Sequence, residues 1–150
     1  MSLNLAGLQL AVMDHARRLG RFATVLDHEP TAAPGQRGVT VAYWLGPVEP
    51  IRASGLNSTS ARVEFAARLY RNMFAEPQSD LEIIGALDTL MAAYSGDFTL
   101  GGLVRSIDLL GAYGAPLGAT PGYATVGTTL FRVVDVVLPL IVNDLWTQAP

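Results

Sequence analysis

The two histidines of this chain are the first candidates for chemistry, because each follows an aspartate. The pairs are Asp14-His15 and Asp27-His28. A metal or catalytic site would need both pairs to converge in space with a third group. His15 lies on or beside the apolar face of a predicted helix, where a partly buried, hydrogen-bonded histidine is the simpler interpretation. His28 falls in a proline-flanked turn, where an exposed polar residue is ordinary. We therefore expect no metal site and no cofactor.

Other catalytic motifs are also missing from the 150 residues. There is no cysteine, and all ten basic residues are arginines. This composition excludes a Cys-ligated zinc or iron–sulfur site, thiol catalysis, Schiff-base chemistry and the lysine of a phosphate loop. The glycines of residues 111–122 lack the G-x-G-x-x-G spacing, and no serine stands in G-x-S-x-G. Asp80 and Glu82 lie close in sequence but are explained by a helix start. We name no catalytic residue and expect no enzyme.

The charge balance argues against nucleic-acid recognition. The net charge is −3 and the pI about 5.2, which is the wrong sign for a protein that neutralises phosphates. Arg62, Arg68 and Tyr70 form a faint basic and aromatic mixture on one predicted strand. Glu64 stands between the two arginines, and it predicts an ordinary solvated face of ion pairs.

The chain is hydrophobic for a protein without an evident membrane span. Half of its residues are hydrophobic, and the mean hydropathy is +0.32. The most apolar stretch, 130–142, contains Arg132, Asp135 and Pro139 and is shorter than the roughly 20 residues that a span needs. The N-terminus has no basic region ahead of an apolar one, so we expect no secretory signal and no membrane association. Burial against other subunits is another use for such hydrophobicity.

Hydrophobic periodicity predicts one domain over residues 1–150, in the order helix, strands, helix, strands. A helix is expected at 5–19, with Asn4 as N-cap, a Leu3–Leu8 staple and Gly20 after its end. A second helix is expected from a capping box at Ser79 and Glu82 to residue 96. Its predicted apolar stripe is Leu81, Ile84, Leu87, Met91 and Tyr94. Strands are expected at 22–27, 39–45, 62–74, 103–110, 123–126 and 128–142.

This order predicts an α+β fold, with a small antiparallel or mixed sheet flanked by two main helices. Residues 46–60 are rich in Gly, Pro, Ser and Asn, and we expect them to form an extended arm or loop. The last predicted strand is apolar on both faces, whereas one face of an antiparallel sheet is usually polar. Both of its faces therefore need cover.

Several long runs of residues make the chain similar to a known family, the tail terminator proteins of long-tailed bacteriophages (siphoviruses), especially those that infect actinobacteria. The similarity begins with the first helix and the strand that carries Trp44. The further runs are Ser54–Phe65, Arg68–Tyr70, Asn72-Met73, Glu76-Pro77, Leu90–Gly102, Asp108–Gly111 and Leu138–Asp144.

This resemblance implies a structural role in the virion. Such proteins form a six-membered ring at the head-proximal end of the tail tube, stop its polymerisation and provide the surface for head–tail joining. The implied partners are further copies of the chain in a hexameric ring, the tail tube protein and a head-completion or neck protein. Genomic double-stranded DNA passes through the lumen without being read. The implied location is the virion tail, and the host cytoplasm during assembly.

Two other functions stay open at this point. The chain could be another neck, head–tail joining or tube-related assembly protein of similar fold, or a small-molecule-binding domain or enzyme. The last class predicts a deep pocket that gathers His15, His28 or several carboxylates. For contacts with subunits or partners we expect the residues Trp44, Arg52, Leu56, Asn57 and Trp146. Trp146, close to the terminus, either docks onto its own domain or anchors a neighbour.

Overall fold

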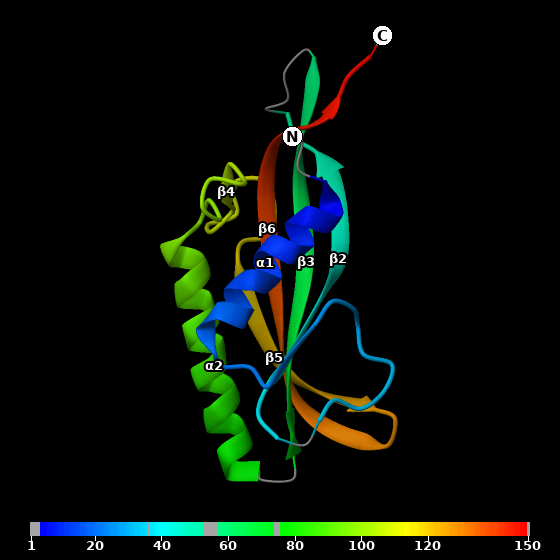
Figure 1. The fold of residues 1–150 in the computed structure, drawn as a ribbon, viewed down its shortest axis with the longest axis vertical. Coiled ribbons are helices and arrows are strands. Elements are labelled where there is room, and N and C mark those ends of the chain that lie inside the picture. The colour runs from blue at the N-terminus through cyan, green and yellow to red at the C-terminus, as the bar shows by residue number, and fades with distance from the viewer. Residues whose placement is uncertain (1–3, 36, 53–56, 74–75, 150) are drawn as a thin grey trace.

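The computed structural model describes residues 4–35, 37–52, 57–73 and 76–149. It contains two helices and a six-stranded sheet, drawn in Figure 1. The elements are α1 (Leu5–Leu19), β1 (Thr24–Leu26), β2 (Thr40–Pro50), β3 (Ser58–Asn72), α2 (Glu76–Gly96), β4 (Ser106–Ile107), β5 (Gly118–Val126) and β6 (Thr129–Thr147).

The sheet is mixed. Its order is β1-β2-β3-β6-β4, and β5 also pairs with β6. β1 runs parallel to β2, and the other pairs are antiparallel. The predicted α+β fold is therefore confirmed, although the sheet is larger than the small one expected. Its centre is the long pairing of β3 with β6, which reaches from Ser58↔Thr147 to Asn72↔Phe131.

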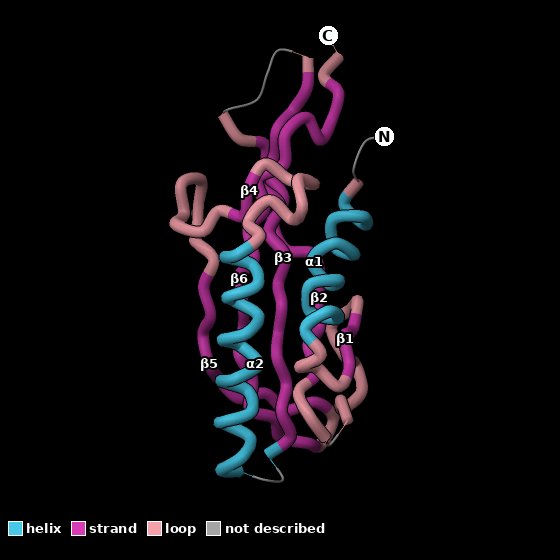
Figure 2. The backbone as a smooth tube through the Cα atoms, turned by 60° about the vertical axis from the view of Figure 1, so that its left-hand side comes forward, coloured by secondary structure: helices cyan, strands magenta, loops and turns pink. Residues whose placement is uncertain are grey.

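Both helices pack on one face of the sheet, and Figure 2 shows them in front of β2, β3 and β6. Alternate residues of β3 point toward the helices, as the two-residue period predicts. Val63, Phe65, Ala67 and Leu69 are all buried there. They meet Leu8 and Val12 of α1, Ile83 and Leu90 of α2, and Val134, Val136, Leu138, Leu140 and Val142 of β6.

The outer face of the sheet has a second, smaller apolar cluster at one end. Ala42, Tyr70, Phe131 and Val133 are buried there, and Trp44 packs against them. β5 and the start of β6, drawn in gold and orange, bend away from the plane of the long strands (Figure 1). The expectation that both faces of β6 are covered is thus correct for this end of the strand.

α1 has the predicted bounds, because both of its ends carry strong signals. Asn4 Oδ1 accepts a hydrogen bond from the Gly7 N–H at 2.7 Å, and Gly20 adopts the left-handed conformation at φ +67°. Arg17 and Arg18 lie in the last turn, where the helix dipole favours positive charge. Leu3, the other half of the predicted staple, lies outside the described residues.

The predicted start of α2 is wrong. The helix begins at Glu76, so Ser79 lies inside it and does not cap it. Glu82 has a different partner, because its carboxylate accepts a hydrogen bond from Arg71 Nε at 2.8 Å. An ion pair with the neighbouring strand thus takes the place of the expected capping box.

The apolar stripe predicted for α2 is wrong at its first two residues, whereas Leu87 and Met91 pack partly buried against the core and Tyr94 is fully buried, as predicted. Leu81 and Ile84 are 74% and 58% exposed. The face that packs on the sheet consists of Ile83, Ala86, Leu90 and Tyr94. Two neighbouring stripes of this helix are apolar, so periodicity alone could not select the buried one.

Part of the predicted arm at 46–60 belongs to the sheet. β2 continues to Pro50 and β3 begins at Ser58, so only the connection between them remains outside a strand. Residues 53–56 of that connection lie outside the described residues. Pairing with β3 extends β2 past Pro47 to Pro50, with a register shift between Leu45 and Val48.

The predicted strand at 103–110 is wrong except for the two residues of β4. The chain makes tight turns before it, in which Leu100, Gly101 and Gly102 all have positive φ. Asp97 stabilises these turns by accepting a hydrogen bond from the Gly101 N–H at 2.9 Å. The turns continue through residues 103–105 and the chain turns again after Asp108, where Gly111 has a φ of +79°, so only Ser106 and Ile107 are extended. β1 is shorter than expected, whereas β5 and β6 are longer.

Candidate functional site

The two histidines do not converge. His15 Nε2 lies 3.2 Å from Asp97 Oδ2, and its ring meets the Tyr94 ring edge-on at 5.5 Å. His28 is exposed, and its Nδ1 is 2.7 Å from Asp27 Oδ1. The two rings line different clefts. Within the described ranges, no group of three His, Cys, Asp or Glu side chains is placed to hold a metal ion.

A buried chain of hydroxyls lies behind His15. The Tyr94 hydroxyl donates to the Val12 carbonyl at 2.7 Å and is 2.7 Å from the Tyr43 hydroxyl. Since Tyr94 has one proton to donate, Tyr43 must be the donor to Tyr94. Burial raises the pKa of both tyrosines well above the usual value, so both stay neutral. This chain joins α1, α2 and β2 and has a structural role.

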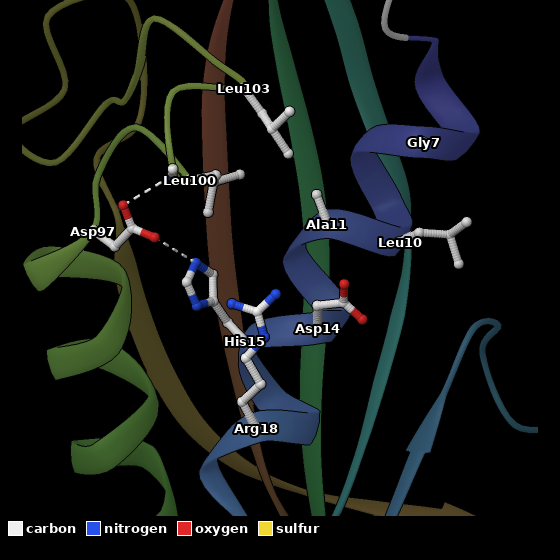
Figure 3. Close-up of a pocket in the computed structure, with 10 residues that line it drawn as sticks. Gly7, Leu10, Ala11, Asp14, His15, Arg18, Asp97, Leu100 and Leu103 are labelled. Carbon is white, nitrogen blue, oxygen red and sulfur yellow. Dashed lines mark hydrogen bonds and ion pairs between the residues drawn. The ribbon is translucent and has the colours of Figure 1, made fainter.

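A cleft of ten lining residues lies between α1 and the turn at 97–103, and we call it the α1 cleft. It has a volume of about 390 Å³. Figure 3 shows Leu103 pointing from the turn toward α1, Asp97 facing His15, and the Arg18 guanidinium reaching up beside the His15 ring. The apolar lining comes from Leu10, Ala11, Leu100 and Leu103, and the polar lining from Asp14, His15, Arg18 and Asp97. The cleft therefore collects one histidine and two carboxylates, although His28 is not among them.

Residues 108–117 form a second notable feature, a loop held in a defined shape. The Asp108 carboxylate is buried and accepts hydrogen bonds from the N–H groups of Ala112 and Tyr113, at 2.7 and 2.9 Å. The Ala115 carbonyl accepts from Arg62 Nη2 at 3.0 Å. In contrast to this anchoring, Leu110 is 94% exposed.

Arg62 lies beneath this loop, and its position differs from the solvated face of ion pairs that the sequence predicts for this strand. It pairs with Glu64 at 3.0 Å, as predicted, but it is only 4% exposed and thus not part of a solvated face. Gly114 makes this burial possible, because a Cβ at Gly114 would lie 2.7 Å from Arg62 Nε. That Nε is buried and finds no hydrogen-bond acceptor in the described part of the chain. Arg68, on the same strand, bonds Asp135 at 2.5 Å and lies over the Trp44 ring at 5.6 Å.

Of the five expected interface residues, three that the structure describes lie at one end of the molecule. Asn57 is exposed, and its carbonyl accepts a hydrogen bond from the Gln148 N–H at 2.8 Å. Trp146 is opposite Thr59 and is 41% exposed. Arg52, also exposed, lines a cleft beside the connection that leads to β3. Trp44 is apart from them, half-buried on the outer face of β2, and Leu56 lies outside the described residues.

A β-bulge sets the direction of Trp146. Between the pairs Thr59↔Trp146 and Ala61↔Val142, β6 contains two more residues than β3. Asp144 has a φ of +53°, and Ser58 donates a hydrogen bond to its carboxylate. The bulge returns Leu145 to the core, so Trp146 extends the last strand pair at the end where the C-terminus lies (Figure 1).

The surface carries many large apolar side chains that the sequence reasoning did not identify. Besides Trp146 they are Leu10, Leu45, Leu81, Ile84, Phe98, Leu103, Leu110, Tyr113, Tyr123 and Leu130. For Leu110 a signal existed, because it precedes the glycine-rich segment 111–114. For the other exposed residues, the surrounding sequence has the same pattern of apolar residues as a segment that packs in the core, so the sequence does not mark them as exposed.

No family model and no curated protein matches the sequence. Among solved structures, a chain in the virion of a native gene transfer agent particle is similar, with 19% sequence identity and a TM-score of 0.40. The similarity covers 91% of this chain and 96% of that chain. A TM-score this low does not establish a common fold. In the described helices, no segment is long and apolar enough to cross a membrane.

Proposed function

We propose that this chain is a structural protein of a bacteriophage virion, which forms a ring at the head-proximal end of the tail tube. In that position it ends tube polymerisation and presents a surface for head–tail joining. One face of the ring imitates a ring of tube subunits and docks on the last one. The opposite face lacks the surface that would recruit the next tube subunit.

The observation that carries this proposal is the number of large apolar side chains on the surface. Eleven of them are exposed within the described residues, and they occur on α1, α2, β2, β5, β6 and the loops between. Apolar residues exposed singly are ordinary, but Leu10 and Leu103 line one cleft together, and Leu81 and Ile84 are neighbours one turn apart on α2. Exposed apolar residues grouped in this way indicate surfaces that a partner covers. The resemblance to tail terminator proteins supports a tail ring as the kind of assembly.

The free strand edges favour contacts through side chains. Beyond its pairing with β1, the outer edge of β2 has no partner strand among the described residues, and neither has the outer edge of β5. β2 contains Pro47 and Pro50 there, and β5 contains Pro121. Since proline has no N–H to donate, such edges resist addition of another strand. We therefore expect neighbouring subunits to meet mainly through side chains.

Antibody labelling of the virion tests the location. A gold-labelled antibody against the chain would be applied to intact virions of the phage that encodes it, and to isolated tails. Label at the head-proximal tip of the isolated tail supports the proposal. Label on the portal side alone, or along the whole tube, would instead support another neck protein or a tube-related protein. Absence of label from the virion would contradict the proposed structural role.

A further inference from the structure

The loop 108–117 presents an apolar side chain on a rigid support. Asp108 binds two backbone N–H groups within the loop, and its carbonyl also accepts from the Leu117 N–H at 3.2 Å. Gly111 has a φ of +79°, and a Cβ there would lie 2.6 Å from the Gly114 carbonyl oxygen. The shape of the loop is thus fixed before any partner binds, which lowers the entropy lost on association.

Leu110 stands on this support with 94% of its surface exposed. Its neighbour Leu109 packs against the core. Displaying a leucine to water in this way does nothing for the isolated chain, because burial of its side chain would be favourable. A rigid loop with an apolar tip is the kind of feature that inserts into a cavity of a partner.

The α1 cleft has the size and lining to receive such a tip. Its volume of about 390 Å³ exceeds the roughly 150 Å³ of a cavity that holds benzene, and benzene is larger than a leucine side chain. Leu10 and Leu103 on its rim are both about half-exposed. The side chains in Figure 3 leave the cleft open between α1 and the turn.

The charges beside the two features are complementary. Arg105 is exposed next to the loop, with its guanidinium 5.9 Å from the Tyr113 ring. In the part of the chain that the structure describes, no carboxylate lies within ion-pair distance of it. The α1 cleft contributes two carboxylates, Asp14 and Asp97, which pair with Arg17 at 3.6 Å and with His15 at 3.2 Å and are still 52% and 41% exposed. A cationic tip is attracted to these exposed carboxylates, and this attraction favours one orientation of docking.

From these observations we infer that Leu110 of one copy of this chain inserts into the α1 cleft of the next copy. The tip and the cleft are different surfaces of the chain, so the contact is head-to-tail and generates a ring if the rotation closes. This inference rests on the proposed ring and adds the residues that join its subunits.

Engineered cysteines test the contact directly, because the natural chain has none. One variant carries Leu110→Cys and a second carries Leu103→Cys. The two are mixed at equal amounts, oxidised, and analysed by non-reducing electrophoresis and mass measurement. We expect a disulfide between the two different variants. The matched control replaces Leu103→Cys with Ile84→Cys, an equally exposed position on α2 outside the cleft, and we expect no such product from it.

A second pair of variants measures the contact without a covalent bond. Leu110→Asp should weaken association by about tenfold or more, since it removes the buried leucine, whereas the control Leu81→Asp should change it less than about threefold. Both side chains are exposed, so neither change should unfold the chain. If the unmodified chain assembles but the cysteines do not join and Leu110→Asp has no effect, the inference is wrong and the proposed ring stands. If the unmodified chain associates neither alone nor on isolated tube ends, both are wrong.

Discussion

At the residue scale, a chain of hydrogen bonds explains how the two helices are held against the sheet. It consists of the Tyr43 hydroxyl, the Tyr94 hydroxyl and the Val12 carbonyl. The three groups come from β2, α2 and α1, and both tyrosine side chains are fully buried. Each proton has an acceptor. A buried polar chain of this kind specifies one arrangement of the elements, because any other arrangement leaves groups unpaired.

Removing the central hydroxyl tests this role. Tyr94→Phe removes the acceptor of the buried Tyr43 hydroxyl and a side-chain donor to the Val12 carbonyl, and it should lower the free energy of unfolding by about 1–3 kcal/mol. Urea denaturation measures the change. Tyr123→Phe is the matched control on an exposed ring and should change the value by less than about 0.5 kcal/mol. An equal effect of both variants would contradict the role.

The same two tyrosines predict how stability depends on pH. Their pKa values are raised in the folded state by burial, so they keep their protons where the unfolded chain, with a pKa near 10.0, loses them. The unfolded state then binds fewer protons, and stability falls as the pH rises above about 10. The double variant Tyr43→Phe with Tyr94→Phe should lose stability less steeply in this range. Denaturation curves between pH 8 and 11 test this, and parallel slopes would contradict it.

Two glycines give opposite predictions for the same substitution. Gly114→Ala places a methyl group against buried Arg62, whose hydrogen bonds to Glu64 and Ala115 restrict its movement, so it should destabilise by about 1–3 kcal/mol. Gly85→Ala lies in α2 with open space around the new Cβ and should stabilise by up to about 1 kcal/mol. Thermal unfolding compares them. Equal shifts in Tm would show that loop 108–117 does not pack as described.

At the element scale, α2 shows where sequence periodicity is insufficient. α1 has one apolar stripe and two capping signals, and its bounds follow from the sequence. α2 is apolar on two adjacent stripes, and only packing against β3 and β6 selects between them. The predicted strand at 103–110 is a similar case, because its leucines and valine suggest a strand, whereas the turns on both sides of Ser106 and Ile107 leave only these two residues extended.

The adjacent residues Ile83 and Ile84 separate the two faces of α2 by experiment. Ile83→Ala removes a fully buried side chain and should cost about 2–5 kcal/mol. Ile84→Ala changes an exposed one and should cost less than about 0.5 kcal/mol. Both substitutions delete the same atoms, so chemical denaturation compares the two positions directly. A larger loss of stability at Ile84 than at Ile83 would contradict the described orientation of α2 on the sheet.

At the scale of the whole molecule, the fold class followed from the order of elements, but the candidate site did not follow from residue types. Chemistry-bearing motifs are sparse, and the structure brings His15 together with Asp97 while keeping His28 elsewhere. An interface has no such motif, because an exposed leucine and a buried one look alike in sequence. Leu110 and Leu109 are neighbours, yet one is in water and the other packs on the core.

The mass of the native protein distinguishes a ring from a monomer. Purified chain is examined over a series of concentrations and salt conditions, alone and with isolated tube ends, by native mass measurement and negative-stain microscopy. We predict a closed ring of about six copies of the 15.9 kDa chain, near 95 kDa, either free or on the tube end. A chain that stays monomeric at every concentration and also fails to bind tube ends would contradict the account.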